Sequence, residues 1–368
     1  MNIILSGGGT AGHVNPAIAI AEEIMRQDEN SKILFIGRRG GKENLLVTRA
    51  GIKLKTLDVE GLKRKITVDN LQVFRKAVEA RKKAEHIIKE FHPDVILGTG
   101  GYVCWPIISA GQRLGVPTAI HESNVTPGLV TKMLAKRCDL VFLGYERTKE
   151  KISQKAKTCI VGTPLRADFE KISRKEARDS LGLGNNDFMI LSFGGSIGAG
   201  RINDVIVETM KSFSAKKPGV VHIHGAGDRY YKELKDLPFV NEKTRCEIRP
   251  YINDMPRLMK AADVVICRCG ALTLSEISAV GVASILIPSP NVSGNHQYRN
   301  ARHLHDCGAA TVIEEKDLSQ ELLIKLLKEL QNDKNERKNR AKKLNSFSHP
   351  DASNLIVKEL KMLEFASK

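Results

Sequence analysis

The stretch 262–288, ADVVICRCGALTLSEISAVGVASILIP, constrains the fold more than any other part of the chain. An apolar run at 264–267 leads through a glycine turn at Gly270 into a helix expected over about 272–280, and a second apolar run ends the stretch. This pattern predicts a β-α-β unit. Because such a turn points the first N–H groups of the helix beyond the end of the strand, it favours an anion such as a diphosphate.

Glu276 lies one turn further into this helix. A carboxylate at that place suits two hydroxyl donors, as the acidic residue of a dinucleotide site does when it binds a ribose. A packing helix with a solvated glutamate is the alternative interpretation of the same residues.

The rest of the chain alternates strands and helices as a parallel, doubly wound α/β sheet does. Two strands, 2–6 and 188–193, each run into a glycine-rich loop (7–15 and GGSIGAG), and a helix is predicted from Pro16 to Arg26 with the proline in its first turn. Further strands are predicted at 32–36, 54–57, 95–98, 118–121, 140–143, 220–224, 245–249, 264–267, 284–287 and 309–313.

The chain of 368 residues is long enough for two domains. We expect Rossmann-like domains at 1–163 and 164–345, a linker near 161–166, and a last helix within 350–368 that packs back on the first domain.

The first glycine loop has a competing interpretation. Gly7, Gly9 and Gly12 fit the GxGxxG dinucleotide fingerprint, which on its own is a weak signal. At the end of the second strand the sequence reads Ile36-Gly37-Arg38-Arg39, without the acidic residue of an NAD site. An NADP enzyme could use these arginines, so an NADP-dependent oxidoreductase stays a minority alternative. A second glycine loop and His13 are not needed for hydride transfer, and they favour group transfer from a nucleotide-linked donor.

Such a donor carries a diphosphate, and the sequence has no Asp-x-Asp pair to hold one through a metal ion. Helix N-termini, the backbone amides of 196–199 and Arg166 are expected to hold it instead. His13 lies where a strand gives way to a helix, and the helix dipole there disfavours a protonated ring. His13 is therefore a candidate general base, with a helix-capping or structural role as the alternative.

Composition narrows the class of protein further. Seven cysteines without a CxxC pair indicate reduced packing residues in a cytosolic protein, and no apolar run reaches the length of a membrane span. The first residues run directly into a strand, so no secretion signal is expected. The net charge of +16 leaves nucleic acid, anionic lipid and acidic substrates open as partners.

A series of motifs then points to a family: GGGTAGHVNPA (7–17), GGYVCWP (100–106), HESNVTPGL (121–129), VGTPLR (161–166), FGGSIGA (193–199), YINDMP (251–256), CRCGALTLSE (267–276) and NHQYRNAR (295–302). Together they resemble the MurG family of GT-B glycosyltransferases. These enzymes transfer N-acetylglucosamine from UDP-N-acetylglucosamine to undecaprenyl-pyrophosphoryl-N-acetylmuramyl-pentapeptide, which converts lipid I to lipid II in bacterial cell-wall synthesis.

The resemblance covers residues 2 to about 313. It implies two Rossmann-like domains with parallel sheets facing across a cleft, and an inverting transfer without metal or cofactor, in which the 4-hydroxyl of the muramyl sugar attacks the anomeric carbon. It also implies that 1–163 binds acceptor and membrane and that 164–345 binds the donor.

Site residues follow from the same resemblance. His13 is the implied catalytic base. The implied substrate-binding residues are Thr10, Ala11 and Gly12 near the donor sugar and diphosphate, Asn124 by the sugar, Arg166 and Ser196 by the phosphates, the Ile252 backbone against the uracil, Ala271, Leu272, Thr273, Leu274, Ser275 and Glu276 for phosphate and ribose, and Gln297 for the sugar hydroxyls. Glu122 is a candidate carboxylate partner for His13.

The chain also departs from the family pattern. Ala11 replaces a usual glycine, Ser123 and Ile197 each replace a usual glutamine, and His296 stands where some members have glutamine. None of these changes removes a charged group from the implied site. A UDP-N-acetylglucosamine 2-epimerase and a non-catalytic nucleotide-sugar binder stay open as alternatives.

The segment 61–90 holds nine lysine and arginine residues against four acidic ones. Lys63, Arg64 and Lys65 precede Leu71, Phe74 and Val78, which are spaced as one apolar helix stripe, and Lys132, Lys136 and Arg137 are expected to extend the patch. We expect this surface to bind the anionic cytoplasmic face of the cell membrane peripherally, with packing of the stripe on the sheet as the alternative. No nucleic-acid motif accompanies the charge, so no nucleic-acid partner is expected.

Overall fold

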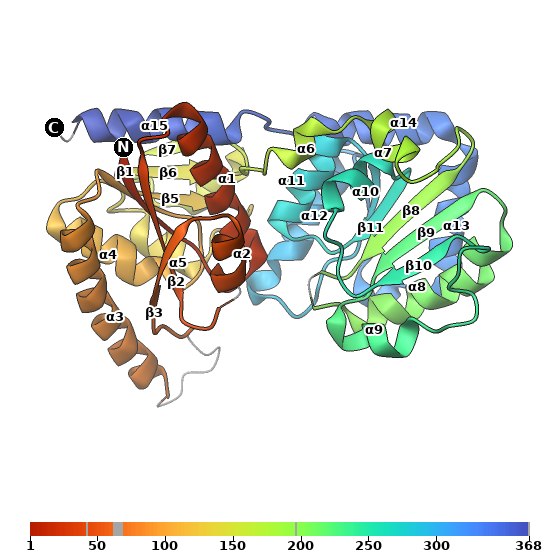
Figure 1. Cartoon of the computed structure of the whole chain (residues 1–368), viewed down its shortest axis with the longest axis horizontal. Helices are drawn as coiled ribbons and strands as arrows, with labels where there is room; N and C mark the ends of the chain where they lie inside the picture. The colour runs from red at the N-terminus through yellow and green to blue at the C-terminus, as the bar shows by residue number, and fades with distance from the viewer. Residues whose placement is uncertain (42, 62–68, 196, 367–368) are drawn as a thin grey trace. The chain divides into compact units, whose positions relative to one another are not determined.

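The computed structural model describes residues 1–41, 43–61, 69–195 and 197–366. The chain divides into two compact units, one of residues 1–166 with 349–368 and the other of residues 167–348. Figure 1 shows a β-sheet with surrounding helices in each.

The first unit has a seven-stranded sheet in the order β3-β2-β1-β4-β5-β6-β7, in which every pair of neighbouring strands is parallel. Its strands are β1 (Asn2–Ser6), β2 (Lys32–Arg38), β3 (Lys53–Leu57), β4 (Val95–Gly98), β5 (Thr118–Glu122), β6 (Leu140–Leu143) and β7 (Thr158–Ile160). Its helices are α1 (Ala11–Gln27), α2 (Glu43–Arg49), α3 (Asp69–Phe91), α4 (Cys104–Leu114), α5 (Leu129–Leu134), the 3-10 helix η1 (Glu146–Lys151) and α15 (Ala352–Ala366).

The second unit has a six-stranded parallel sheet in the order β10-β9-β8-β11-β12-β13. Its strands are β8 (Phe188–Phe193), β9 (Val220–Gly225), β10 (Cys246–Arg249), β11 (Val264–Cys267), β12 (Ala283–Leu286) and β13 (Thr311–Val312). Its α-helices are α6 (Asp168–Lys171), α7 (Arg174–Asp179), α8 (Gly200–Ser212), α9 (Asp228–Leu234), α10 (Met255–Ala261), α11 (Ala271–Val280), α12 (His296–Asp306), α13 (Gln320–Asn332) and α14 (Lys334–Asn345).

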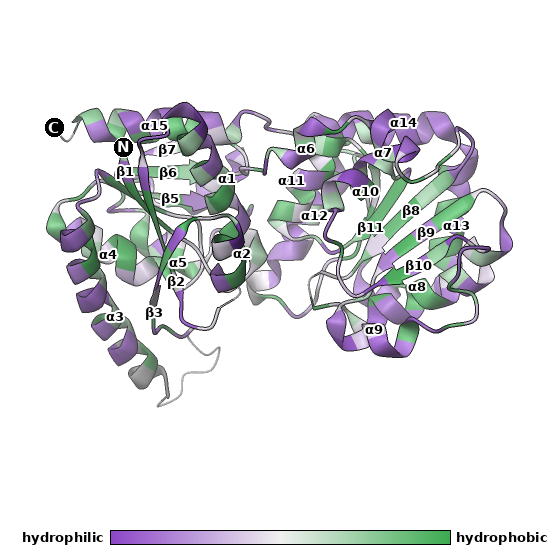
Figure 2. Ribbon diagram, viewed as in Figure 1, coloured by the Kyte–Doolittle hydropathy of each residue, from purple (hydrophilic) through white to green (hydrophobic). Residues whose placement is uncertain are grey.

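The central strands of both sheets are covered on both faces, which explains their continuous apolar sequences. All residues of β4, β8 and β11 are buried. In Figure 2, β8 is largely green, whereas α14 is largely purple. The prediction of two Rossmann-like domains, each with a parallel sheet, is confirmed.

Helix α1 begins earlier than the sequence pattern predicts. A loop was expected over 7–15 and a helix from Pro16, but the helix starts at Ala11 and Pro16 lies inside it. At this interior position Pro16 has no N–H to donate to the Gly12 carbonyl, and burial of its ring offsets this loss. His13 therefore lies in the first turn of α1 and not in a loop.

The C-terminal helix α15 packs on α1 within the first unit. Ile356, Val357 and Leu360 are fully buried in the core on this side of the sheet. Gln27 at the end of α1 donates to Asn354 at 3.0 Å and accepts from Lys361 at 2.8 Å. The last helix thus completes the core of the unit in which the chain begins.

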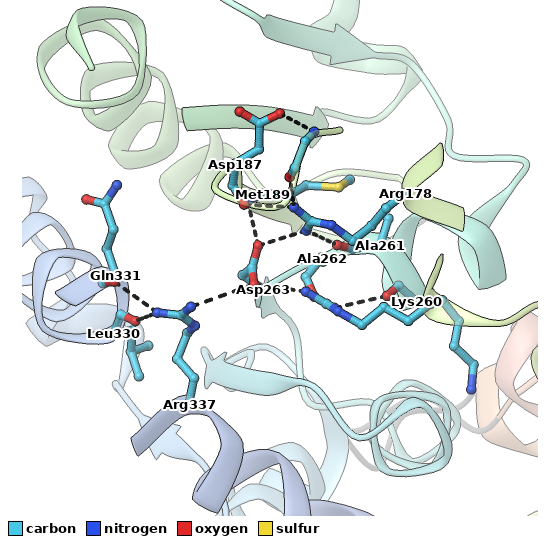
Figure 3. Close-up of polar contacts among 12 residues, drawn as sticks. Arg178, Asp187, Met189, Lys260, Ala261, Ala262, Asp263, Leu330, Gln331 and Arg337 are labelled. Atoms are coloured by element: carbon cyan, nitrogen blue, oxygen red, sulfur yellow. Dashed lines mark hydrogen bonds and ion pairs between the residues drawn. The ribbon is translucent and has the colours of Figure 1, made fainter. Parts of the chain in front are cut away.

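In the second unit, a carboxylate holds the beginning of β11. Figure 3 shows Asp263, which accepts a 2.9 Å hydrogen bond from the backbone N–H of Met189 and forms a 3.1 Å ion pair with Arg178. Arg174 lies 2.9 Å from its other oxygen, and Arg337 lies 3.9 Å away. A half-buried carboxylate with these donors fixes the strand that leads into α11.

Candidate active site

In the first unit, the chain passes from β1 through Gly7, Gly8 and Gly9 to Thr10, whose extended backbone caps α1. Among the described residues, the N–H groups of Ala11 and Gly12 have no hydrogen-bond acceptor. A side chain added at Gly12 would meet only the Thr10 hydroxyl, at 3.6 Å. The start of α1 therefore presents open backbone amides, the arrangement that binds phosphate oxygens in other proteins.

The imidazole of His13 is oriented by a backbone carbonyl. Its Nδ1 lies 2.9 Å from the Gly8 carbonyl oxygen and 3.5 Å from the Thr10 hydroxyl. A carbonyl oxygen can only accept, so Nδ1 carries the proton and Nε2 is left with a lone pair. The neutral ring can then take a proton at Nε2, as a general base must.

The expectation that Glu122 is the carboxylate partner of His13 is wrong. The Glu122 carboxylate is buried and accepts four hydrogen bonds from its own loop: from the backbone N–H and side-chain amide of Asn124, from the N–H of Gly128 and from the Thr131 hydroxyl, at 2.7 to 3.0 Å. These donors account for both carboxylate oxygens. Glu122 is the last residue of β5, and its hydrogen bonds instead fix the position of Asn124, which is one of the predicted site residues.

In the second unit, α11 begins at Ala271, within a residue of the expected start. Its N-cap is Gly270, which has no side chain to cap the free amides of the first turn. Ala271 and Leu274 are buried, whereas Leu272, Thr273, Ser275 and Glu276 are half-buried. The Ser275 hydroxyl donates to the Ala271 carbonyl oxygen at 3.1 Å. The helix therefore combines an open N-terminus with a carboxylate one turn further in.

Gln297 connects two loops beside α11. Its side-chain oxygen accepts hydrogen bonds from the backbone N–H of Cys269 at 3.2 Å and of Ser289 at 2.9 Å. Cys269 follows β11 and Ser289 follows β12, so the amide oxygen joins the carboxyl ends of neighbouring strands. Only the NH₂ group of Gln297 is then left for a ligand, as a hydrogen-bond donor.

The remaining predicted site residues, Ile252, Arg166 and Ser196, lie in different segments of the chain. The side chain of Ile252 is 5% exposed and packs in the core, while its backbone N–H and C=O have no partner among the described residues. Arg166 is exposed and is the last residue of the first unit's N-terminal segment, 1–166. Ser196 lies outside the described residues. Within the described ranges, no group of three histidine, cysteine or acidic side chains is arranged to hold a metal ion.

Both units of the chain are similar to the domains of a known glycosyltransferase family. Residues 3–143 match the glycosyltransferase family 28 N-terminal domain, and residues 189–356 match its C-terminal domain. A protein of Thermoanaerobacter sp. (strain X514), named UDP-N-acetylglucosamine–N-acetylmuramyl-(pentapeptide) pyrophosphoryl-undecaprenol N-acetylglucosamine transferase, is 42% identical over 99% of this chain and 100% of its own length. The chain belongs to glycosyltransferase family 28, in its MurG branch.

Solved structures agree with this membership. The crystal structure of Acinetobacter baumannii MurG superposes with a TM-score of 0.76 at 25% identity, covering 98% of this chain and 99% of that one. This family 28 structure confirms the GT-B fold. A UDP-GlcNAc 2-epimerase from Neisseria meningitidis has a TM-score of 0.69 at 13% identity, covering 98% of this chain and 100% of that one, which shows a shared fold alone.

Sequence reasoning about this family 28 chain missed the residues that support His13. The Thr99 hydroxyl donates to the His13 backbone carbonyl oxygen at 2.7 Å, and Gly100 lies against the imidazole ring. The glycine pair Gly100 and Gly101, one residue beyond the buried strand β4, was the available signal, because such a pair allows close approach of another backbone.

Proposed function

We propose that this chain transfers N-acetylglucosamine from UDP-N-acetylglucosamine to the 4-hydroxyl of the muramyl sugar in undecaprenyl-pyrophosphoryl-N-acetylmuramyl-pentapeptide. The observation that carries this proposal is the 42% identity, over 99% of the chain, to a relative named for that transfer. The named donor and the lipid-linked acceptor are accordingly the two substrates. The oxidoreductase and epimerase alternatives have no comparable support.

The proposed mechanism is a single displacement. His13 Nε2 takes the proton of the acceptor 4-hydroxyl while the oxygen attacks the anomeric carbon, and the bond from that carbon to the β-phosphate oxygen breaks. UDP leaves with the electron pair, and the configuration at the anomeric carbon inverts. The hydrogen bond from Nδ1 to the Gly8 carbonyl supports the role of His13, because it leaves Nε2 unprotonated.

The donor is held by backbone and side-chain groups that need no metal. The first-turn amides of α11 suit the diphosphate, and Glu276 accepts the two ribose hydroxyls. The backbone N–H and C=O of Ile252, which have no partner in the part of the chain that the structure describes, suit the edge of a uracil, which has one donor between two acceptors. The further proposed contacts are Thr10, Ala11, Gly12 and Asn124 with the sugar and diphosphate, Arg166 and Ser196 with the phosphates, Ala271 to Ser275 with phosphate and ribose, and the NH₂ group of Gln297 with a sugar hydroxyl.

Because the proposed acceptor is linked to a lipid, we propose that the reaction takes place at the membrane, on its cytoplasmic leaflet, and we assign the membrane contact to the first unit. Within the described residues, no helix is long and apolar enough to span a bilayer. On α5, Leu129 and Met133 are each 52% exposed, and the neighbouring side chains Lys132, Lys136 and Arg137 are also exposed. Apolar side chains within a basic surface suit an anionic membrane.

The other predicted membrane residues add less structural support. Val78 on α3 is half-buried. Lys63, Arg64 and Lys65, and the side chains of Leu71 and Phe74, lie outside the described residues. They remain part of the proposed contact through their charge and spacing in the sequence.

The role of His13 is tested by His13→Ala. A general base contributes roughly 100- to 10,000-fold to the rate, so kcat is expected to fall by that much while KM for UDP-N-acetylglucosamine stays unchanged. His86→Ala is the matched control, because His86 is exposed on α3 in the same unit. Loss of donor affinity at an unchanged kcat would make His13 a binding residue and remove it from the chemistry.

A further inference from the structure

Two glycines after β4 lie against the groups that orient His13. Gly100 has φ +114° and Gly101 has φ +90°, both in the left-handed region that favours glycine. A Cβ added at Gly100 would lie 2.6 Å from Cδ2 and 3.1 Å from Nε2 of the His13 ring. A Cβ added at Gly101 would overlap the Gly8 carbonyl oxygen, which is the acceptor for His13 Nδ1. There is no room for a side chain at either position.

Hydrogen bonds tie the same two loops together. The N–H of Gly8 donates to the Gly100 carbonyl oxygen at 3.1 Å, and the Cys104 thiol donates to that oxygen at 3.1 Å. Burial raises the pKa of Cys104 to about 11, so the thiol keeps its proton and remains a donor. The Thr99 hydroxyl binds the His13 carbonyl. The segment from Thr99 to Gly101 thus contacts His13 at its backbone, at its ring and through its hydrogen-bond acceptor.

We infer that Gly100 and Gly101 are positioning residues for the general base: they hold the His13 ring with its proton on Nδ1 and its lone pair on Nε2. Gly101 leaves the Gly8 carbonyl where Nδ1 can reach it, and Gly100 leaves space for the Cδ2 and Nε2 edge of the ring. This inference rests on the proposed function for the role of the base, but the orientation and tautomer of the ring do not depend on it.

The test compares Gly100→Ala with Gly115→Ala. Gly115 has φ +74° at the end of α4, and an added Cβ there would meet no atom within 4 Å. Both variants place alanine at positive φ, and the strain is larger at Gly100, whose φ of +114° lies further from the left-handed helical region than the +74° of Gly115. The tautomer of the His13 ring therefore decides, because it reports the contact with the ring and not the backbone strain alone. Gly101→Ala is a second variant, whose added Cβ has its nearest contacts with Gly8 and displaces the Gly8 carbonyl.

Two measurements are made on the full-length protein. In ¹⁵N-histidine NMR, wild type and Gly115→Ala are expected to carry the His13 proton on Nδ1, and Gly100→Ala and Gly101→Ala are expected to lose this single tautomer. In steady-state kinetics with UDP-N-acetylglucosamine and the lipid-linked acceptor, Gly100→Ala is expected to lower kcat roughly 10- to 100-fold, the range for a misplaced catalytic group, without raising KM for the donor.

Wild-type protein with the proton on Nε2, or Gly100→Ala with the spectrum and kcat of Gly115→Ala, would overturn the inference. If wild type transfers no sugar, the proposed function fails, and the NMR comparison still decides whether the glycines position the ring. If circular dichroism shows that Gly100→Ala does not fold, Gly101→Ala takes its place in the test. Loss of the single tautomer and a lower kcat then support the inference, and a spectrum and kcat equal to those of Gly115→Ala overturn it.

Discussion

Glu276 is the residue on which the proposed donor affinity most depends. If its carboxylate accepts both ribose hydroxyls, Glu276→Ala is expected to weaken UDP binding by about 1.5 to 3 kcal/mol, the usual value for hydrogen bonds to a charged group. Isothermal titration calorimetry measures this loss. Glu329→Ala on α13 is the control, because Glu329 is exposed and far along the chain from α11. Equal UDP affinity in both variants would refute the ribose assignment.

The sequence predicts His13 as the general base, but it does not show which group orients the imidazole ring. The side-chain type and the position after a glycine loop are visible in the sequence, whereas a backbone carbonyl acceptor has no residue type that reveals it. Glu122 was a reasonable carboxylate to suggest, but four donors from its own loop use its oxygens. Local hydrogen bonds of this kind depend on loop conformation, which periodicity does not predict.

Among the elements, α5 gives the membrane proposal its clearest test. We expect the protein to co-sediment with anionic vesicles but not with zwitterionic ones, and salt to release it, because screening weakens attraction between charges. The double variant Leu129→Ser with Met133→Ser is expected to weaken vesicle binding without changing UDP affinity. Leu355→Ser is the control, since Leu355 is also exposed, on α15 of the same unit. Binding that is indifferent to salt and to lipid charge would contradict the proposal.

The strands were largely predictable because buried parallel strands form short apolar runs, as β1, β4 and β8 do. The start of helix α11 was also predicted to within one residue, because a glycine flanks the helix at each end. Helix α1 was misplaced because Pro16 was assigned to the first turn, its commonest helical position, although tertiary packing buries it further in. Strand β13 is shorter than predicted, with only Thr311 and Val312 paired to β12.

At the scale of the whole molecule, buried histidines give its stability a pH dependence. His222 and His224 are fully buried in β9, where their rings bond to Ser192, Ser214 and Asn203 at 2.8 to 3.1 Å. Burial lowers the pKa of His222 to about 3 and that of His224 to about 4, whereas both have a pKa near 6.5 when unfolded. Below pH 6.5, the unfolded chain therefore binds protons that the folded chain does not.

The contribution of these two histidines to the free energy of unfolding is therefore greatest above pH 6.5, and it falls as the pH drops toward 4. The expected slope is at most about 1.4 kcal/mol per pH unit for each histidine. Urea unfolding at pH 7.5 and pH 5.0 measures the effect, before most carboxylates titrate. A free energy of unfolding that is equal at the two pH values would show that the buried rings do not stay neutral.

The central claim is the transfer reaction itself, and one assay tests it most directly. Purified protein is incubated with UDP-N-acetylglucosamine labelled in the sugar and with undecaprenyl-pyrophosphoryl-N-acetylmuramyl-pentapeptide, in excess EDTA, beside a reaction that lacks the acceptor. We predict that label enters the lipid-linked product in step with release of UDP, that EDTA does not reduce the rate, and that the donor is unchanged without acceptor. Label that stays out of the lipid while the donor becomes its 2-epimer, or a transfer that EDTA abolishes, would contradict the account.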